Sequence, residues 1–316
     1  GETDLVVNTP SMSGGAMRLQ GIRQKAVSGP KVTHFSYFER DESVQALLRA
    51  LKGDDSGFEL LEGPSRAEIS RGGKEPKRKD DAPIVFILPG IMGSHIQLGR
   101  DRIWFEPFSM WSGDMARLRA DVAEGVTADG WMDRNYEMLA RHLAETHEVR
   151  PFAYDWRLSI TQAARDFGKQ LDRAMRDAKA RGKALRIVAH SMGGLVARLA
   201  LKDRWSEFKA IPGSRLLQLG TPNQGSHSIA AVLMARDDFV QTIERWFDWK
   251  HDLREFLEIV RDFPGVLELL PWPGTDGKAR DGVDYFDAAV WQAWFDQDQD
   301  SKKGKSWQPP QQGPLS

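Results

Sequence analysis

The feature that most constrains this fold is an apolar run that stops at a serine and continues as a helical pattern, at residues 186–198. Ser191 stands at the turn, and two glycines follow Met192. Small residues are needed there because the backbones of strand and helix approach closely. The pattern predicts a nucleophile elbow, in which the hydroxyl of Ser191 is pushed out above a parallel sheet and the amide of Met192 faces a developing oxyanion. By itself the pattern is also compatible with an ordinary turn that carries an incidental serine.

A second glycine-containing turn, at residues 89–94, follows an apolar run at 83–88. Acyl transfer at a serine requires a second backbone donor beside the nucleophile, and the loop after an early strand is where such folds place it. We therefore expect the amide of Ile91 or Met92 to share the oxyanion with that of Met192. The alternative is a turn that does no more than end its strand.

Apolar runs alternate with helical patterns along the middle of the chain. The runs predict strands at 84–88, 148–153, 185–189 and 215–219, and the patterns predict helices at about 135–146, 162–181 and 193–203. This alternation is typical of a parallel sheet covered on both faces, with the functional crevice beyond the carboxyl ends of the strands. Ser191 and the turn at 89–94 both follow strand ends directly, so we expect them on the same rim.

Several further segments carry a resemblance to a known family. They are Tyr154-Asp155-Trp156-Arg157, Leu219-Gly220-Thr221-Pro222 and the segment from Phe263 to Pro271. Together with the two turns, these segments resemble the lecithin:cholesterol acyltransferase-like branch of the α/β-hydrolases, a group of lipases, phospholipases and acyltransferases, over about residues 83–272. The resemblance implies a three-layer αβα fold with a mostly parallel sheet and helical cap insertions. It also implies that Ser191 is the nucleophile and that Asp155 and Arg157 are structural.

Residues 95–131 and 225–295 do not fit the alternation of strands and helices. Both are rich in aromatic residues, and the second contains apolar residues spaced mostly three or four apart. Such a stripe is typical of a helix that packs on the core, and equally of a cap whose apolar underside accepts an acyl chain. The two interpretations are compatible, and we expect cap segments at these two places.

A nucleophilic serine requires a histidine base that is oriented by a carboxylate. Downstream of Ser191 the chain has only His227, which comes too early for the usual base loop, and His251, which is typical of a solvated helix face. His190 adjoins the serine and is expected to point away from it. None of these histidines has the position that the fold predicts for the base.

The N-terminal segment contains a better match for the missing groups. Asp4 lies in an acidic turn, His34 follows about thirty residues later, and a helical pattern comes after it at about 41–51. This order resembles the acid loop, histidine loop and closing helix of an α/β-hydrolase. Two explanations stay open: the segment ends an upstream hydrolase domain, or the domain is circularly permuted and Asp4 and His34 complete the Ser191 site. The absence of a strand before Asp4 favours the first.

The domain organisation expected from these features has four parts. Residues 1–52 form the hydrolase tail, 53–82 a flexible linker, 83–300 the hydrolase body with its cap segments at about 95–131 and 225–295, and 301–316 a disordered tail. Under the first explanation, a second hydrolase domain is a partner in the full-length protein.

Composition narrows the function further. The 44 basic and 45 acidic residues leave a formal net charge of −1, so no strong field attracts nucleic acid. The chain has no cysteine, which excludes thiol catalysis and thiolate zinc sites, and with no signal peptide this slightly favours the cytoplasm. Its apolar runs are too short for a transmembrane segment. We expect a serine esterase, lipase or acyltransferase that handles lipid-like esters through an acyl-enzyme at Ser191, without cofactor or metal. The alternative is a non-catalytic lipid- or protein-binding module that keeps the fold.

Overall fold

The computed structural model describes residues 22–27, 40–61, 82–99, 101–104, 125–131, 133–234, 259–274 and 278–300. Asp4, His34, His251 and the expected tail at 301–316 lie outside the described residues.

The centre of the molecule is a four-stranded sheet in the order β7-β3-β8-β9, and all of its strands run parallel. The strands are β3 (Ile84–Leu88), β7 (Glu148–Pro151), β8 (Leu185–His190) and β9 (Arg215–Leu219). All four predicted strands are present, with β7 two residues shorter and β8 one residue longer than expected. The predicted parallel sheet is therefore confirmed.

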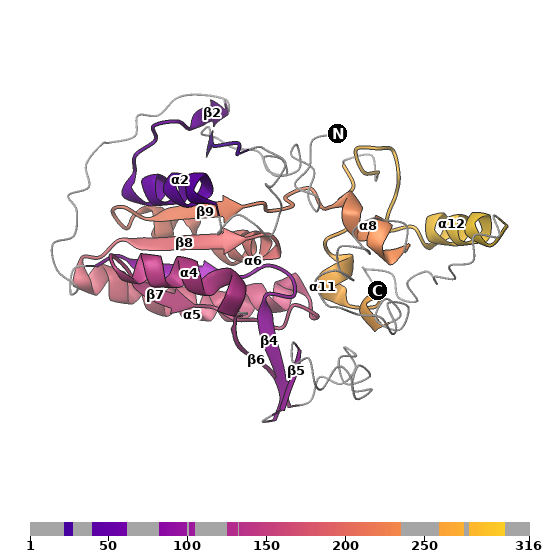
Figure 1. Ribbon diagram of the computed structural model, residues 1–316, viewed down its shortest axis with the longest axis horizontal. Helices are drawn as coiled ribbons and strands as arrows, with labels where there is room; N and C mark the ends of the chain where they lie inside the picture. The colour runs from indigo at the N-terminus through magenta and orange to yellow at the C-terminus, as the bar shows by residue number, and fades with distance from the viewer. Residues whose placement is uncertain are drawn as a thin grey trace.

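Helices cover both faces of this sheet (Figure 1). They are α2 (Asp41–Lys52) and α4 (Asp133–Ala144) on one face, and α5 (Ile160–Arg181) and α6 (Met192–Leu201) on the other. Alternate strand residues point to opposite faces, as the pleat requires: Val85 and Val188 pack with α2 and α4, whereas Phe86 and Ile187 pack with α5 and α6. The three-layer αβα arrangement is confirmed.

The N-terminal helix α2 packs on the body of the molecule. Its Leu47 and Leu51 are buried against the sheet, and it lies over β9 (Figure 1). The chain then forms β2 (Glu59–Leu61), which pairs antiparallel with β1 (Ile22–Gln24). Residues 59–61 of the expected linker at 53–82 thus belong to a strand that pairs with β1.

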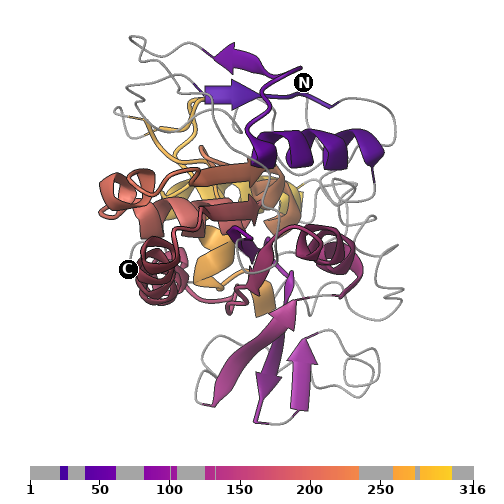
Figure 2. The same cartoon turned by 90° about the vertical axis from the view of Figure 1, so that its left-hand side faces the viewer.

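The first predicted cap segment is a second, antiparallel sheet. It contains β4 (Ser94–Leu98), β5 (Asp101–Trp104) and β6 (Val126–Trp131) in the order β5-β4-β6. This sheet projects from the central one (Figures 1 and 2). The described residues of this segment form strands where the resemblance implies helices. A short connection around Gly99, whose φ of 63° suits a tight hairpin turn, joins β4 to β5.

The second predicted cap segment belongs partly to the main core. Its described helices are α8 (His227–Leu233), α11 (Pro264–Leu267) and α12 (Ala288–Asp300), and the short α7 (Trp205–Lys209) precedes β9. Phe263, Val266 and Leu270 are buried in the same cluster as the central strands. No helix in the described ranges is long and apolar enough to cross a membrane.

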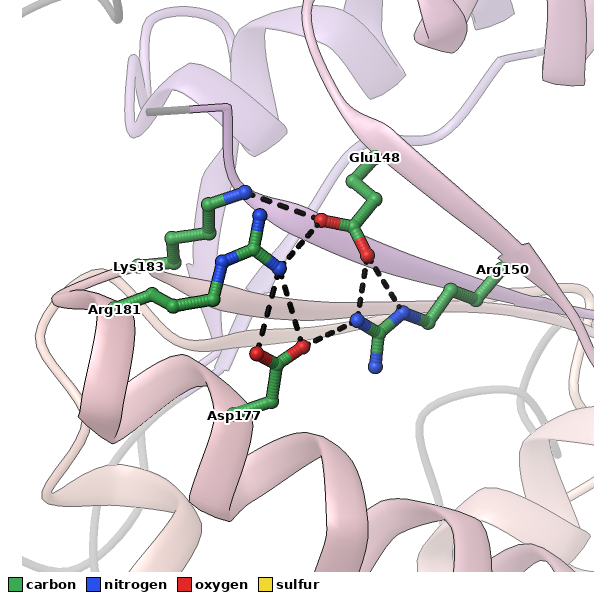
Figure 3. Close-up of polar contacts among 5 residues, drawn as sticks. All are labelled: Glu148, Arg150, Asp177, Arg181 and Lys183. Carbon is green, nitrogen blue, oxygen red and sulfur yellow. Dashed lines mark hydrogen bonds and ion pairs between the residues drawn. The ribbon is translucent and has the colours of Figure 1, made fainter. Parts of the chain in front are cut away.

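A network of five charged side chains lies where β7 begins and α5 ends (Figure 3). Its members are Glu148, Arg150, Asp177, Arg181 and Lys183. The Glu148 carboxylate accepts hydrogen bonds from Arg150 Nε at 2.9 Å, Arg181 at 3.0 Å and Lys183 Nζ at 3.1 Å. Burial alone raises the pKa of Glu148, but the hydrogen bonds from Arg150, Lys183 and Arg181 outweigh it and hold that pKa at about 2.

We predict that Glu148→Gln lowers the free energy of unfolding by about 1–3 kcal/mol, because it leaves a buried ammonium without a charged acceptor. The Lys183 side chain is only 2% exposed. The wild-type contribution is present above the ordinary carboxyl pKa of 4.5 and is lost as the pH falls towards 2, so the variant loses less stability over that interval. Denaturant unfolding at pH 7 and pH 3 measures both effects.

Glu207→Gln is the matched control. Glu207 pairs with Lys179 at 2.6 Å, and both side chains are about half exposed. Exposed pairs of this kind contribute little, so the change is expected to stay within about 0.5 kcal/mol. Equal losses in the two variants would contradict the importance of the network.

Candidate active site

Ser191 lies between the end of β8 and the start of α6 in a strained backbone conformation. Its φ is 51° and its ψ is −126°, backbone angles that few residues other than glycine adopt. The amide of Ser191 donates to Leu219 O at 2.8 Å, and its carbonyl accepts from Gly194 N at 2.9 Å. The sheet and the helix thus fix this conformation from both sides, and the strand, turn and helix that the sequence predicts are present.

The two glycines after Met192 are required by close contacts on both sides of α6. A Cβ atom on Gly193 would lie 2.4 Å from the carbonyl oxygen of Pro89, and one on Gly194 would lie 1.9 Å from Thr221 Oγ1. Real Cβ atoms do not approach other atoms so closely, so a larger residue at either position would displace its neighbours. Thr221 belongs to the predicted Leu-Gly-Thr-Pro segment, which therefore packs directly against the turn.

The turn after β3 lies directly against Ser191. A Cβ atom on Gly90 would be 2.9 Å from Ser191 Cβ, and Ile91 and Met92 follow Gly90 directly in this turn. Met92 also has a positive φ, of 61°. Among the described residues, the amides of Ile91, Met92 and Met192 donate to no other protein group. Three amides that the sequence proposes as oxyanion donors are thus left uncommitted close to the serine.

Three aromatic side chains hold this turn in place. The Tyr136 hydroxyl accepts from Gly90 N at 2.9 Å, the Tyr154 hydroxyl donates to Pro89 O at 2.8 Å, and Trp104 Nε1 donates to Met92 O at 3.0 Å. Burial raises the pKa values of both tyrosines, so their hydroxyls stay protonated. Sequence reasoning missed the roles of Tyr136 and Trp104, because each reaches the turn from another element of the fold.

His190 contacts the same group of residues. Its Nδ1 lies 2.9 Å from the Tyr136 hydroxyl, on the α2 and α4 side of the sheet. A Cβ atom on Gly90 would lie 3.1 Å from this Nδ1. The imidazole therefore packs behind the turn and hydrogen-bonds to the tyrosine that positions it.

The exposure of Ser191 differs from the expectation. Only 2% of the residue is exposed, which is less than the sequence pattern predicts for a serine above the sheet. The turn at 89–93 packs closely against the serine and contributes to this burial.

Among the described residues, no histidine and carboxylate pair lies in hydrogen-bonding contact with Ser191. Asp4 and His34 lie outside them, and no histidine in the described ranges forms a hydrogen bond with the Ser191 hydroxyl. His227 does have a carboxylate partner that sequence reasoning missed: its Nε2 lies 3.1 Å from Asp281 Oδ2. The Tyr285 hydroxyl donates to the same oxygen at 2.7 Å.

The residues that the resemblance marks as structural lie below the site. The Arg157 side chain is fully buried and donates to Asp155 through Nε at 2.9 Å. Its carbonyl accepts from Gly265 N at 3.1 Å, which joins α11 to the loop after β7. Glu268 completes the connection by accepting from Ser159 Oγ and from Ile160 N, so it caps the start of α5.

Two comparisons with known proteins bear on this arrangement. The family model described as lecithin:cholesterol acyltransferase matches residues 131–291, just over half of the chain. A Saccharomyces cerevisiae protein, named Uncharacterized protein YJR098C, is 33% identical over 89 residues, which are 28% of this chain and 13% of that protein. The chain thus matches a small part of the length of this relative. The matched family region includes Ser191 and Thr221, whereas the turn at 89–93 precedes it.

We predict that Tyr136→Phe lowers the free energy of unfolding by about 1–3 kcal/mol, because it removes the hydroxyl that accepts from the buried Gly90 amide and contacts His190 Nδ1. Tyr285→Phe is the matched control. Its hydroxyl donates to Asp281, whose side chain is 36% exposed, so water can replace the hydroxyl as a donor in the variant. Denaturant unfolding of both variants measures the difference, and equal losses would show that the contact behind the turn has no special weight.

Proposed function

Because the chain belongs to the lecithin:cholesterol acyltransferase family, we propose that it is a serine hydrolase or acyltransferase for lipid-like esters, with Ser191 as its nucleophile. The observation that carries the proposal is the strained Ser191 turn packed against the turn at 89–93. Strain of this kind persists only where the surrounding structure holds it, and it is concentrated at functional sites.

The proposed reaction has two stages. Ser191 Oγ attacks the acyl carbon of the ester and gives up its proton to a base, and the carbonyl oxygen becomes an oxyanion. The carbon–oxygen bond to the alcohol then breaks, the alcohol leaves with that proton, and an acyl-enzyme remains. Water or a second alcohol attacks the acyl-enzyme in the same way, which releases an acid or a new ester and restores the serine. Hydrolysis and transfer differ only in this acceptor.

The oxyanion would be bound by backbone amides. Met192 begins α6, so its amide lies at the positive end of that helix, and Ile91 or Met92 supplies the second donor across the contact between the turns. Removing one such donor typically costs about 10²–10³-fold in rate. The three aromatic hydrogen bonds to the turn at 89–93 support this role, because they hold the second donor in place before substrate arrives.

Access to the serine would require an opening movement. We propose that the atoms packed over Ser191 move aside when an ester binds. They would then close around the acyl chain, as the lids of many enzymes do. Such closure would also limit water at the acyl-enzyme, which is the property that separates transfer from hydrolysis.

We predict that a fluorophosphonate probe labels the wild-type protein and that Ser191→Ala abolishes this labelling. Ser206→Ala, at an exposed serine of α7, is the matched control and should label as the wild type does. Mass spectrometry of the labelled peptide identifies the modified residue. If the folded wild-type protein takes up no probe, the enzyme proposal fails and the non-catalytic lipid- or protein-binding module becomes the better explanation.

Two pairs of residues compete for the roles of base and orienting acid. Under the circularly permuted arrangement we propose His34 as the base and Asp4 as its orienting carboxylate, and the competing pair is His227 with Asp281. His34→Gln should then slow labelling by roughly 10²–10⁴-fold, the usual contribution of a general base. His227→Gln should leave the rate nearly unchanged. The reverse result would assign the base to His227, and full labelling in both variants would place it on neither.

A further inference from the structure

Two arginines lie side by side at the end of the sheet that is remote from Ser191. Arg186 and Arg215 are direct partners in the parallel register of β8 and β9. Both project to the face covered by α2 and α4, because Arg186 lies two residues from Val188 and Arg215 two residues from Leu217, which pack on that face. Like charges that are direct neighbours in a sheet repel each other, so this pairing is unfavourable unless something compensates it.

The described chain supplies neither arginine with a carboxylate partner. Arg186 donates through Nη1 to His147 Nε2 at 2.5 Å, while its Nε is buried and unpaired in the described structure. Arg215 Nη2 lies beside Gly53, where a Cβ atom would be only 2.5 Å away. Buried donors without acceptors are costly, and each calls for an explanation.

His147 does not offset the positive charge. Its Nδ1 lies 2.8 Å from Thr146 Oγ1, and burial together with the charge of Arg186 lowers its pKa to about 4. The ring is therefore neutral at pH 7 and gives Arg186 a lone pair only. Burial and the neighbouring Arg215 lower the pKa of Arg186 itself to about 10, which leaves it charged but unfavourably placed.

The opposite face of the same sheet end shows how the chain pairs its charges elsewhere. There the cations Arg150, Arg181 and Lys183 surround the carboxylates Glu148 and Asp177 (Figure 3). On the α2 and α4 face, the C-terminal end of α2 at Gly53 contributes partial negative charge beside Arg215. A helix end is equivalent to about half a charge, which falls well short of two guanidinium groups.

We propose that Arg186 and Arg215 form a binding site for a doubly charged oxyanion of the phosphate type. Two guanidinium groups present several N–H donors in the planar arrangement that suits phosphate oxygens. Both arginines are partly exposed, so the site is reachable from solvent. It lies at the opposite end of β8 from Ser191, and it does not depend on the function proposed above.

The test uses inorganic phosphate and the whole chain. In the wild-type protein, phosphate should raise Tm by roughly 2–4 °C more than sodium chloride of equal ionic strength. Isothermal titration calorimetry with phosphate should give one saturable site. Arg186→Gln and Arg215→Gln should each lose the extra rise in Tm and the calorimetric signal. Arg204→Gln is the control, because Arg204 already pairs with Asp172 and should keep both responses.

The variants also make a prediction without phosphate. Arg215→Gln should unfold at a Tm equal to or above that of the wild type at low salt, because it removes a repulsive charge. A lower Tm in both arginine variants, combined with no calorimetric signal in the wild type, would show that the pair is compensated within the chain and would overturn the proposal. Phosphate also stabilises proteins without binding to them, so a rise in Tm that persists in both variants would overturn it as well.

The source of the phosphate group is distinguished by two further ligands. Glycerol phosphate represents a soluble ester, and vesicles that contain phosphatidic acid, against neutral vesicles, represent a lipid headgroup. Calorimetric binding of glycerol phosphate that is lost in Arg186→Gln supports a soluble ligand. Sedimentation with the acidic vesicles alone, again lost in that variant, supports the headgroup. Binding of neither, together with no response to inorganic phosphate, counts against the site.

Discussion

The contact between the turn after β3 and the turn after β8 is the constraint on which the rest of the site depends. Because β3 and β8 are parallel neighbours, their carboxyl ends lie side by side and their turns must share the same space. Only glycine at 90 and 193 lets the two backbones approach as closely as they do. That approach is what brings the amides of one turn next to the serine of the other.

The parts of the fold that were predicted from the sequence are those with a strong local signal. The runs at 84–88 and 215–219 match β3 and β9 in full. β3 is a continuous apolar segment, as buried parallel strands are, and β9 has leucine at three of its five positions. The antiparallel sheet at 94–131 was missed because its strands are short and mix polar with apolar residues. The glycine at 99 was the available signal for its first hairpin.

The same distinction holds within the site. Ser191, Met192, Ile91 and Met92 were found because each follows a strand directly, and the structure places their turns together. The partners of those turns depend on long-range contacts that no local pattern encodes. Tyr136 lies 46 residues from Gly90, whose amide donates a hydrogen bond to its hydroxyl. The carboxylate that pairs with His227 comes from yet another segment. The burial of the serine is likewise a tertiary property, set by packing between turns.

The two ends of β8 therefore carry opposite electrostatic problems. At one end, the amides beside Ser191 have no acceptor within the described part of the chain, and the oxyanion that forms during the reaction would be one. At the other end, Arg186 and Arg215 have no carboxylate partner among the described residues, and a bound anion would supply a permanent negative charge. Six residues of extended strand separate the two ends by roughly 16 Å. The strand between them is almost entirely buried, so salt screens the two sites from each other less than it would screen exposed charges.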